Sequence, residues 1–452
     1  MTRCVPRAAG SLALWAMCLS AASGHGQPAS PPVALTVEDA TARALAMSHR
    51  LDEATARGRA ADAVVDQRRA ALLPRLGAQA GYTRTNHIET FGILLPNDQL
   101  RVIYPDIPDN YRTRLDAQWP IYTGGRLQAL ERAARTEAAA AAQDAHALRA
   151  DLRVEVARAY WALVAARETV RVLDRALTQV GVHLADARAR LDAGLVPPNE
   201  VLSAEAQQAR QQMLRAQAVG SSETAEAALV RLTGLPPGTS LQLTSEPTPA
   251  PDDRELLAAT PHMGDLLALA REARADRRAL AERVAATRLR AAAAGAGRRP
   301  TVAVAGGFDY ARPNPRIFPR LAEWRQSWDA SVNVDWPLFD AGRANADVAE
   351  ATAAGRAAEA RLAEFDSMLA LEIQQRLSER GSSLAAIAAA DVAVRAATEA
   401  HRVLGERFRA GVATSTEVLD AEMAILQAQL DRTQALATLR IAEAGLARAI
   451  GR

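Results

Sequence analysis

An internal duplication limits the fold of this chain more than any other feature of its sequence. Residues 120–126 resemble residues 337–343, an offset of 217 positions. At the same offset, residues 191–195 resemble residues 408–412. One offset that holds without a gap over such a distance is not expected by chance, even in an alanine-rich chain. A weak repeat of this size predicts two similar structural halves.

The placement of proline indicates where long helices can form. Four stretches contain none: 121–196, 199–235, 262–299 and 338–452. Because proline inside a helix costs about 3 kcal/mol, these stretches are free to be helical, and their Ala, Leu, Arg, Gln and Glu content favours that state. Within 170–191 the apolar residues recur in steps of three and four, which is typical of a coiled-coil seam. A helix over 124–193 would be about 105 Å long and must pack lengthwise against equally long neighbours.

Short stretches of alternating polar and apolar or small residues predict four strands. They are 76–84, 111–122, 301–312 and 327–339. Each is long enough to cross a bilayer as a tilted strand, and 13 of the 18 aromatic residues lie within 82–122 or 308–339. Four aromatics fall at the ends of the expected strands, where membrane-interface side chains belong: Trp119, Tyr122, Trp336 and Phe339. The alternative is two amphipathic hairpins packed on a soluble core.

Four strands in a membrane imply an oligomer. They cannot close a barrel, and an open sheet edge is not viable in lipid. Eight strands leave an interior filled by side chains, whereas twelve, from three identical copies, would enclose a lumen. If the strands are in a membrane, the chain should therefore be at least a trimer.

The N-terminal residues are typical of a secretory signal peptide. Two arginines precede an apolar stretch at 8–23, and small residues lead to an expected cleavage near Gly24. Both cysteines, Cys4 and Cys18, lie inside this leader, so the mature chain is expected to contain no thiol. A lipid-modified Cys18 is an open alternative, although residues 15–17 are poor neighbours for that processing.

Composition excludes several functional classes. The formal charge is +2, and the leader contributes two arginines, so the mature chain is close to neutral and no nucleic-acid partner is expected. The absence of lysine excludes a phosphate-loop or Schiff-base lysine. The histidines lack metal-ligand spacing, and we find no catalytic motif. We therefore expect neither an enzyme nor a cofactor or metal site.

The doubled order of these features resembles the TolC family of outer-membrane efflux proteins. The likeness covers residues 35–452 and is most specific at two helix turns, 190–205 and 407–422. The remaining motifs flank the expected strands: Leu73-Pro74, Trp119-Pro120, Gly124-Gly125-Arg126, Arg299-Pro300, Trp336-Pro337 and Ala341-Gly342-Arg343.

This resemblance implies a mostly α fold with a small β part. Three subunits would share one transmembrane β-barrel, with four strands each, and a long α-helical barrel in the periplasm. The function implied is the exit duct of a tripartite efflux or type I secretion system, with a periplasmic membrane-fusion adaptor and an inner-membrane pump as partners. The expected divisions are a signal peptide at 1–24, a first repeat at 35–234, an equatorial linker at 235–261 and a second repeat at 262–452.

The resemblance also implies two functional regions at the helix turns. The expected adaptor-docking tips are Ala193, Gly194, Leu195, Ala410, Gly411 and Val412. The expected residues of the periplasmic aperture are Glu417, Asp420, Glu200, Asn199 and Phe408. Glu417 and Asp420 are three apart and share a helix face, so threefold symmetry would repeat them as carboxylate rings that favour cations. Ala413 replaces the arginine that helps to lock some family members shut, which leaves such a latch without that residue.

Two other protein classes stay open, and the cargo is not readable. A periplasmic adaptor also has a signal peptide and a helical hairpin, but usually one hairpin framed by β domains. An elongated, soluble coiled-coil scaffold would not need aromatics gathered in strand-length stretches. Isolated acids on a helix are also commonly solvated surface. Drug, metal and protein export would all use the same conduit.

Overall fold

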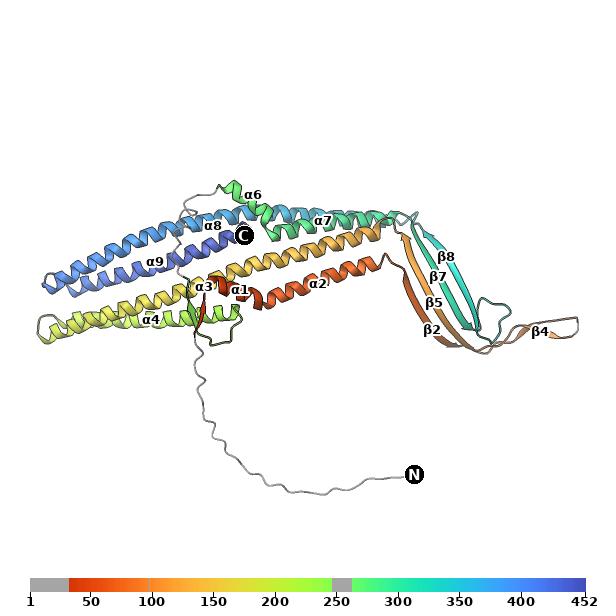
Figure 1. Ribbon diagram of the computed structural model, residues 1–452, viewed down its shortest axis with the longest axis horizontal. Helices are drawn as coiled ribbons and strands as arrows, with labels where there is room; N and C mark the ends of the chain where they lie inside the picture. Colours follow the sequence, from red (N-terminus) through yellow and green to blue (C-terminus); the bar gives the residue numbers. More distant parts are fainter. Residues whose placement is uncertain (1–31, 97, 246–261) are drawn as a thin grey trace, which may run out of the picture.

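The computed structural model describes residues 32–96, 98–245 and 262–452. The predicted signal peptide and most of the predicted linker lie outside the described residues. The molecule is elongated, with helical hairpins at one end and a curved sheet at the other (Figure 1). Within the described ranges, no helix is both long and apolar enough to cross a membrane.

Two long helical hairpins repeat the same dimensions. The long helices α3 (Arg126–Asp192) and α8 (Arg343–Arg409) have 67 residues each, and α4 (Pro198–Leu232) and α9 (Ser415–Ala449) have 35 each. All bounds of the second hairpin lie 217 positions beyond those of the first, which is the offset found in the sequence. The predicted long helix pairs are confirmed, and each 67-residue helix is about 100 Å long.

The shorter helices reveal a second offset. They are α1 (Val37–Met47), α2 (His49–Ala70), α6 (Met263–Ala273) and α7 (Ala275–Gly295), with the short 3-10 helix η1 (Ala296–Arg298) after α7. Helices α6 and α7 begin 226 residues after α1 and α2. The two offsets, 226 and 217, differ by nine residues. The first repeat is therefore longer between its short and long helices, where its strands lie.

The four predicted strands form one antiparallel sheet. Its order is β2 (Arg75–Arg84), β5 (Asp109–Tyr122), β7 (Thr301–Arg312) and β8 (Arg325–Asp335). The last strand ends earlier than predicted, so Trp336 and Phe339 lie beyond it rather than within it. Asp335 pairs with Thr301, the first residue of β7, and Pro300 has no N–H with which to continue the ladder.

Two further strand pairs were not predicted. Strand β1 (Val33–Leu35) pairs in parallel with β6 (Leu241–Leu243), so part of the predicted linker belongs to a small sheet. Strands β3 (Phe91–Leu94) and β4 (Leu100–Tyr104) form a separate hairpin that projects beyond the main sheet (Figure 1). These strands are only three to five residues long, too short for a clear period in the sequence.

The helices lie side by side in the same order as the strands. Helix α3 packs on α2, α4, α7 and α9, and α8 packs on α7 and α9. The core is largest around the middle of α3, where the Tyr160 hydroxyl donates to the Leu35 carbonyl at 3.0 Å. A second cluster joins α6, α8 and α9 around Leu369 and Ile373. The layer has two open edges: α2 and α4 on one side, and α8 on the other.

Candidate functional site

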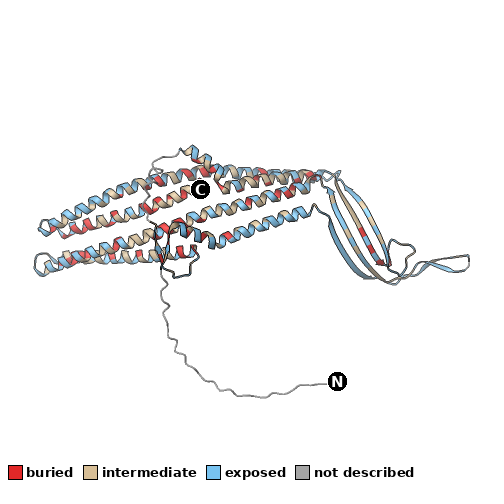
Figure 2. Ribbon diagram, in the orientation of Figure 1, coloured by how far each residue is buried: buried red, intermediate tan, exposed pale blue. Residues whose placement is uncertain are grey.

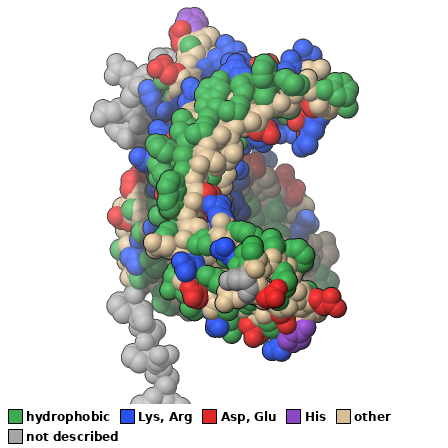
Figure 3. All heavy atoms as spheres, turned by 90° about the vertical axis from the view of Figure 1, so that its right-hand side faces the viewer, with side chains coloured by type: hydrophobic (Ala, Val, Ile, Leu, Met, Phe, Trp, Pro, Cys, Tyr) green, Lys and Arg blue, Asp and Glu red, His purple; other side chains and the backbone are tan. Residues whose placement is uncertain are grey.

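The main sheet has one apolar and one polar face. Leu115, Phe308 and Trp328 occupy one row of the register, and all three are exposed. Because side chains opposite each other in an antiparallel sheet share a face, the register places further large apolar residues on this face; together with the first three they are Leu76, Leu115, Trp119, Val302, Val304, Phe308, Trp328, Val332 and Val334. Figures 2 and 3 show that the sheet is largely exposed and that hydrophobic side chains gather along it.

The opposite face carries a network of ion pairs. Asp309 is 1% exposed and accepts from Arg112 at 2.6 Å and from Arg114 at 2.5 Å. Arg114 crosses strand β7 to reach Asp329 at 3.2 Å. A Cβ atom at Gly307 would overlap with the Arg114 guanidinium, so the glycine makes room for this crossing. An exposed apolar face opposite a polar one is the pattern of a barrel wall between lipid and lumen.

Aromatic side chains mark both ends of the apolar face. At the helical end, the Trp119 and Trp336 indoles donate to the carbonyls of Leu72 and Arg298 at 3.2 and 3.3 Å. Tyr122 and Phe339, which follow these two tryptophans by three positions in the sequence, are also exposed. The other end holds a cluster that the sequence analysis did not single out, with ring centroids 5.0 to 5.9 Å apart: Tyr82, Tyr111, Trp324 and Tyr310.

The spacing of these two aromatic ends fits a membrane. Tyr111 and Tyr122 lie on the same strand, β5, at its opposite ends. Their separation is about 37 Å along the strand, or about 28 Å along the axis of a barrel whose strands tilt by about 40°. Outer-membrane barrels have an apolar band about 25 Å tall between their two aromatic girdles.

The sheet and the helical layer both end in edges that lack partners within the described residues. Strands β2 and β8 pair on one side only. On the helical edges, Leu202 and Met213 of α4 and Met368 and Leu371 of α8 are exposed. Open strand edges and exposed apolar side chains along matching edges favour closure by further copies of the chain.

The two helix turns have the same backbone geometry. Gly194 and Gly411 adopt φ values of +71° and +74°, which only glycine adopts without strain. Each turn is closed by two hydrogen bonds, from the glycine N–H and from that of the next residue, Leu195 or Val412. The six predicted docking residues are exposed at the same end of the molecule (Figure 1): Ala193, Gly194, Leu195, Ala410, Gly411 and Val412.

Glu417 has a structural role that the sequence analysis did not identify. Its carboxylate accepts from the Thr414 N–H at 2.7 Å, and its own N–H donates to the Thr414 hydroxyl at 3.3 Å. This capping box starts helix α9 and lowers the pKa of Glu417 through the bond from the Thr414 backbone. Asp420, one turn later, is exposed. The lowered pKa of Glu417 favours its ionised form.

The remaining aperture residues lie in different environments. Asn199 is exposed and Glu200 is half-buried in the first turn of α4. Among the described residues, neither makes a hydrogen bond or ion pair with Glu417 or Asp420. Phe408 is only 6% exposed and lies between the two hairpins. The Arg190 guanidinium lies 4.2 Å from the centre of its ring, so Phe408 anchors the end of α8 on α3.

A buried polar cluster close to the turns was missed by the sequence analysis. His183 Nε2 lies 2.7 Å from the Ser415 hydroxyl, which links α3 to α9. His401 Nε2 lies 3.5 Å from Glu422, whose side chain is 9% exposed. Burial raises the pKa of Glu422 to about 7 and lowers the pKa of both histidines. In the sequence, Glu422 lies four residues from both Val418 and Leu426, within the apolar stripe of α9. An acid at such a position was the signal from which this cluster could have been predicted.

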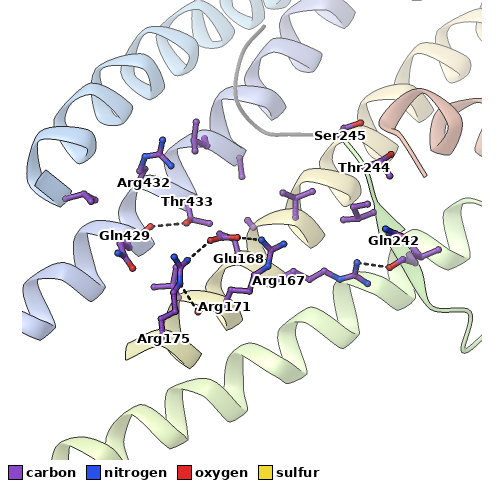
Figure 4. Close-up of a pocket in the computed structure, with 18 of the residues that line it drawn as sticks. Arg167, Glu168, Arg171, Arg175, Gln242, Thr244, Ser245, Gln429, Arg432 and Thr433 are labelled. Carbon is purple, nitrogen blue, oxygen red and sulfur yellow. Dashed lines mark hydrogen bonds and ion pairs between the residues drawn. The ribbon is translucent and has the colours of Figure 1, made fainter. Parts of the chain in front are cut away.

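A cleft of about 830 Å³ lies between α3, β6 and α9. Figure 4 shows Arg171 and Arg175 directed toward Glu168 on α3, with Arg432 on the opposite wall. Arg167 donates to Glu226, and Arg432 to Asp391, at 2.8 and 2.6 Å. Because these arginines already have carboxylate partners, the cleft does not present a free cationic site. Among the described residues, no group of acids and histidines has the arrangement of a metal site.

Comparisons with known proteins agree with this geometry. The model of the family described as "Outer membrane efflux protein" matches residues 41–235 and 266–452. Protein CyaE of Bordetella pertussis is 29% identical over 330 residues, which cover 71% of this chain and 64% of that protein, less than two thirds of its length.

Solved structures share the fold over most of the chain. The outer membrane protein VceC of Vibrio cholerae is 23% identical, with a TM-score of 0.77 and coverage of 92% of this chain and 96% of that one. The outer membrane channel CmeC of Campylobacter jejuni is 17% identical, with a TM-score of 0.78 and coverage of 92% and 85%. The expected fold class, mostly α with a small β part, is confirmed.

Proposed function

Because the chain belongs to the outer membrane efflux protein family, we propose that it is the exit duct of a tripartite efflux or type I secretion system. Family membership places it in the outer membrane and among channels rather than enzymes. The observation that carries the proposal is a sheet with one apolar and one charged face, joined to two equal helical hairpins. Substrates would pass through passively, driven by a pump elsewhere.

Closure requires several copies. Each chain supplies four strands and two open edges. An open edge in lipid leaves N–H and C=O groups unsatisfied at a cost of several kcal/mol each, so β2 of one copy would pair with β8 of the next. Three copies make twelve strands around a lumen lined by the face that carries Arg114 and Asp309. The exposed apolar side chains of α4 and α8 support the same closure in the helical layer.

The helix tips are proposed as the docking site of a periplasmic adaptor. Leu195 and Val412 are large apolar residues that are exposed at the turns. The glycine before each of them has a left-handed backbone that other residues adopt only with strain, and this geometry sets the direction of the turn. Such rigid, exposed apolar knobs are suited to fill grooves on a helical partner.

Glu417 and Asp420 are proposed to set the ion preference of the periplasmic aperture. Both are exposed on the first turns of α9, and three copies would present six carboxylates around the axis. Carboxylate rings attract cations and repel anions. Asn199 and Glu200 would stand on the neighbouring tip, and Phe408 would hold the two tips together through its contact with Arg190.

The duct is tested by isolating the mature chain from membranes in detergent, measuring its mass and recording conductance in planar bilayers. The expected result is a trimer that forms discrete, long-lived channels. A water-soluble or monomeric protein without conductance would refute the duct and favour an adaptor or scaffold.

The aperture is tested by removing charge while keeping the helix cap. In the double variant Glu417→Gln with Asp420→Asn, glutamine can still complete the capping box. We expect weaker cation selectivity and weaker block by multivalent cations from the tip side. The control variant, Asp62→Asn with Asp66→Asn, removes the same charge from exposed positions on α2. Unchanged selectivity in the tip variant would remove the role of these two acids.

A further inference from the structure

The sheet end opposite the helices carries two unequal connections. The mouth hairpin, residues 85–96 and 98–108, joins β2 to β5 and contains β3 and β4. The mouth loop, residues 313–324, joins β7 to β8. We propose that the mouth hairpin of each copy docks on the mouth loop of a neighbouring copy and forms a collar around the outer opening. This proposal rests on the multi-copy barrel proposed above.

The mouth hairpin has too few paired strands to be stable without further contacts. Among the described residues, strand β3 pairs only with β4, in a sheet of two strands, and the turn is closed by a bond from the Leu95 N–H to the Gln99 carbonyl at 2.9 Å. A hairpin of two strands is at best marginally stable in water. The projection of this hairpin beyond the main sheet (Figure 1) therefore calls for a covering surface.

The mouth hairpin also exposes many apolar side chains that another surface could bury. Seven large apolar residues are between 41% and 65% exposed: Ile88, Phe91, Ile93, Leu94, Leu100, Val102 and Tyr104. Figure 3, which faces this end of the molecule, shows hydrophobic side chains around the hairpin. Contiguous exposed apolar surface of this kind marks an interaction site.

Chain connectivity places a second copy within reach of the mouth hairpin. The mouth hairpin starts directly after β2, at one edge of the sheet, and the mouth loop ends directly before β8, at the other edge. Neighbouring strands in the sheet are antiparallel. When β2 of one copy pairs with β8 of the next, Arg84 and the neighbour's Arg325 lie at the same end of the barrel. The hairpin then emerges beside the neighbour's mouth loop.

The two segments are complementary in chemistry. The mouth loop exposes Phe318, Leu321 and Trp324. Its formal charge is +1, from two arginines and one acid, whereas that of the mouth hairpin is −2, from three acids and one arginine. Within one subunit, the Arg320 guanidinium already lies 5.3 Å from the centre of the Tyr104 ring, so hairpin and loop side chains are compatible in contact.

Lipid fits the mouth hairpin less well than a second copy does. A segment that inserts into a membrane surface presents apolar residues together with basic flanks. Here the turn carries Asp98 and Gln99, and the acids Glu89 and Asp106 flank the strands. The excess negative charge would also be repelled by the anionic groups of a membrane surface.

Disulfide trapping tests the collar, because the only native cysteines, Cys4 and Cys18, precede the expected mature chain. In the double variant Ile93→Cys with Phe318→Cys, oxidation should link copies into covalent trimers on a denaturing gel. The matched control, Ile93→Cys with Val64→Cys on α2, should stay monomeric on that gel. Links formed by Ile93→Cys alone would show contact between hairpins and overturn the proposal.

Measuring mass and conductance on the same samples separates a failure of the collar proposal from a failure of the duct proposal. A conducting trimer without the hairpin–loop disulfide overturns the collar and leaves the duct intact, whereas a monomer refutes both. A polarity-sensitive dye on Ile93→Cys that reports an apolar environment only in bilayers would assign the hairpin to lipid. A second variant, Phe91→Ser with Leu94→Ser, should lower the temperature of trimer dissociation; an unchanged temperature also refutes the collar.

Discussion

Replacing Glu422 with glutamine should stabilise the helix tips, and more so at high pH. The side chain is 9% exposed, and its buried oxygen Oε2 has no hydrogen-bond partner among the described residues. Burial raises its pKa from the ordinary 4.5 to about 7. Glutamine has nearly the same shape but no charge to bury, and its amide can donate to the neutral ring of His401.

The sign and size of the effect follow from linkage between protonation and stability. Below pH 4.5 the carboxyl is protonated in the closed and the opened tip, and its burial costs little. As the pH rises toward 7, only the opened state ionises, so the closed tip loses stability up to a total of about 3 kcal/mol. The gain from glutamine should therefore be about 3 kcal/mol at pH 8 and about 1.5 kcal/mol at pH 5.5.

Hydrogen exchange of the α9 amides near Glu422 measures this local opening. A gain of about 3 kcal/mol should slow exchange on the order of 100-fold at pH 8, with a much smaller change at pH 5.5 after correction for intrinsic rates. The control Asp420→Asn removes an acid from an exposed position on the same helix and should have little effect. An equal change at both pH values, or none, would show that ionisation of Glu422 does not oppose closure.

Three other predictions concern the ion pairs of Arg274, the main sheet and the turn between α8 and α9. Arg274→Ala should destabilise the protein by about 3–5 kcal/mol in thermal or denaturant unfolding, because this buried guanidinium joins Asp276 and Glu372. Ala330→Arg, on the apolar face, should lower barrel stability by about 2–4 kcal/mol, whereas Ser331→Arg on the polar face should be nearly neutral in the same folding assay. Gly411→Ala should cost about 1–2 kcal/mol in hydrogen exchange at the tip, from backbone strain alone, because among the described residues no atom beyond its two chain neighbours lies within 4 Å of the added Cβ.

The long helices and the main strands were predictable because their signals are local. The absence of proline and the recurrence of apolar residues in steps of three and four are features of each helix by itself. The alternation of polar and apolar residues is likewise a feature of each strand by itself. The glycines of the turns were readable for the same reason, since a left-handed residue is needed wherever a helix reverses sharply. The sequence offset even matched the helix bounds residue for residue.

The interior of the candidate site was not predictable, because it depends on which helix faces meet. Phe408 was expected at the aperture, and its burial against Arg190 and His183 is a consequence of how α8 lies on α3. The His183–Ser415 contact joins residues 232 positions apart. The end of β8 likewise depends on where its partner β7 begins.

The sequence by itself determined the architecture of each half: its helix lengths, its strands and the reversal at each tip, all of which arise from neighbours in the chain. Only the tertiary structure decided how the halves meet, because side-by-side packing of helices 100 residues or more apart is chosen by the summed burial of many weak contacts. That packing buries Glu422 and leaves β2 and β8 as edges for further copies.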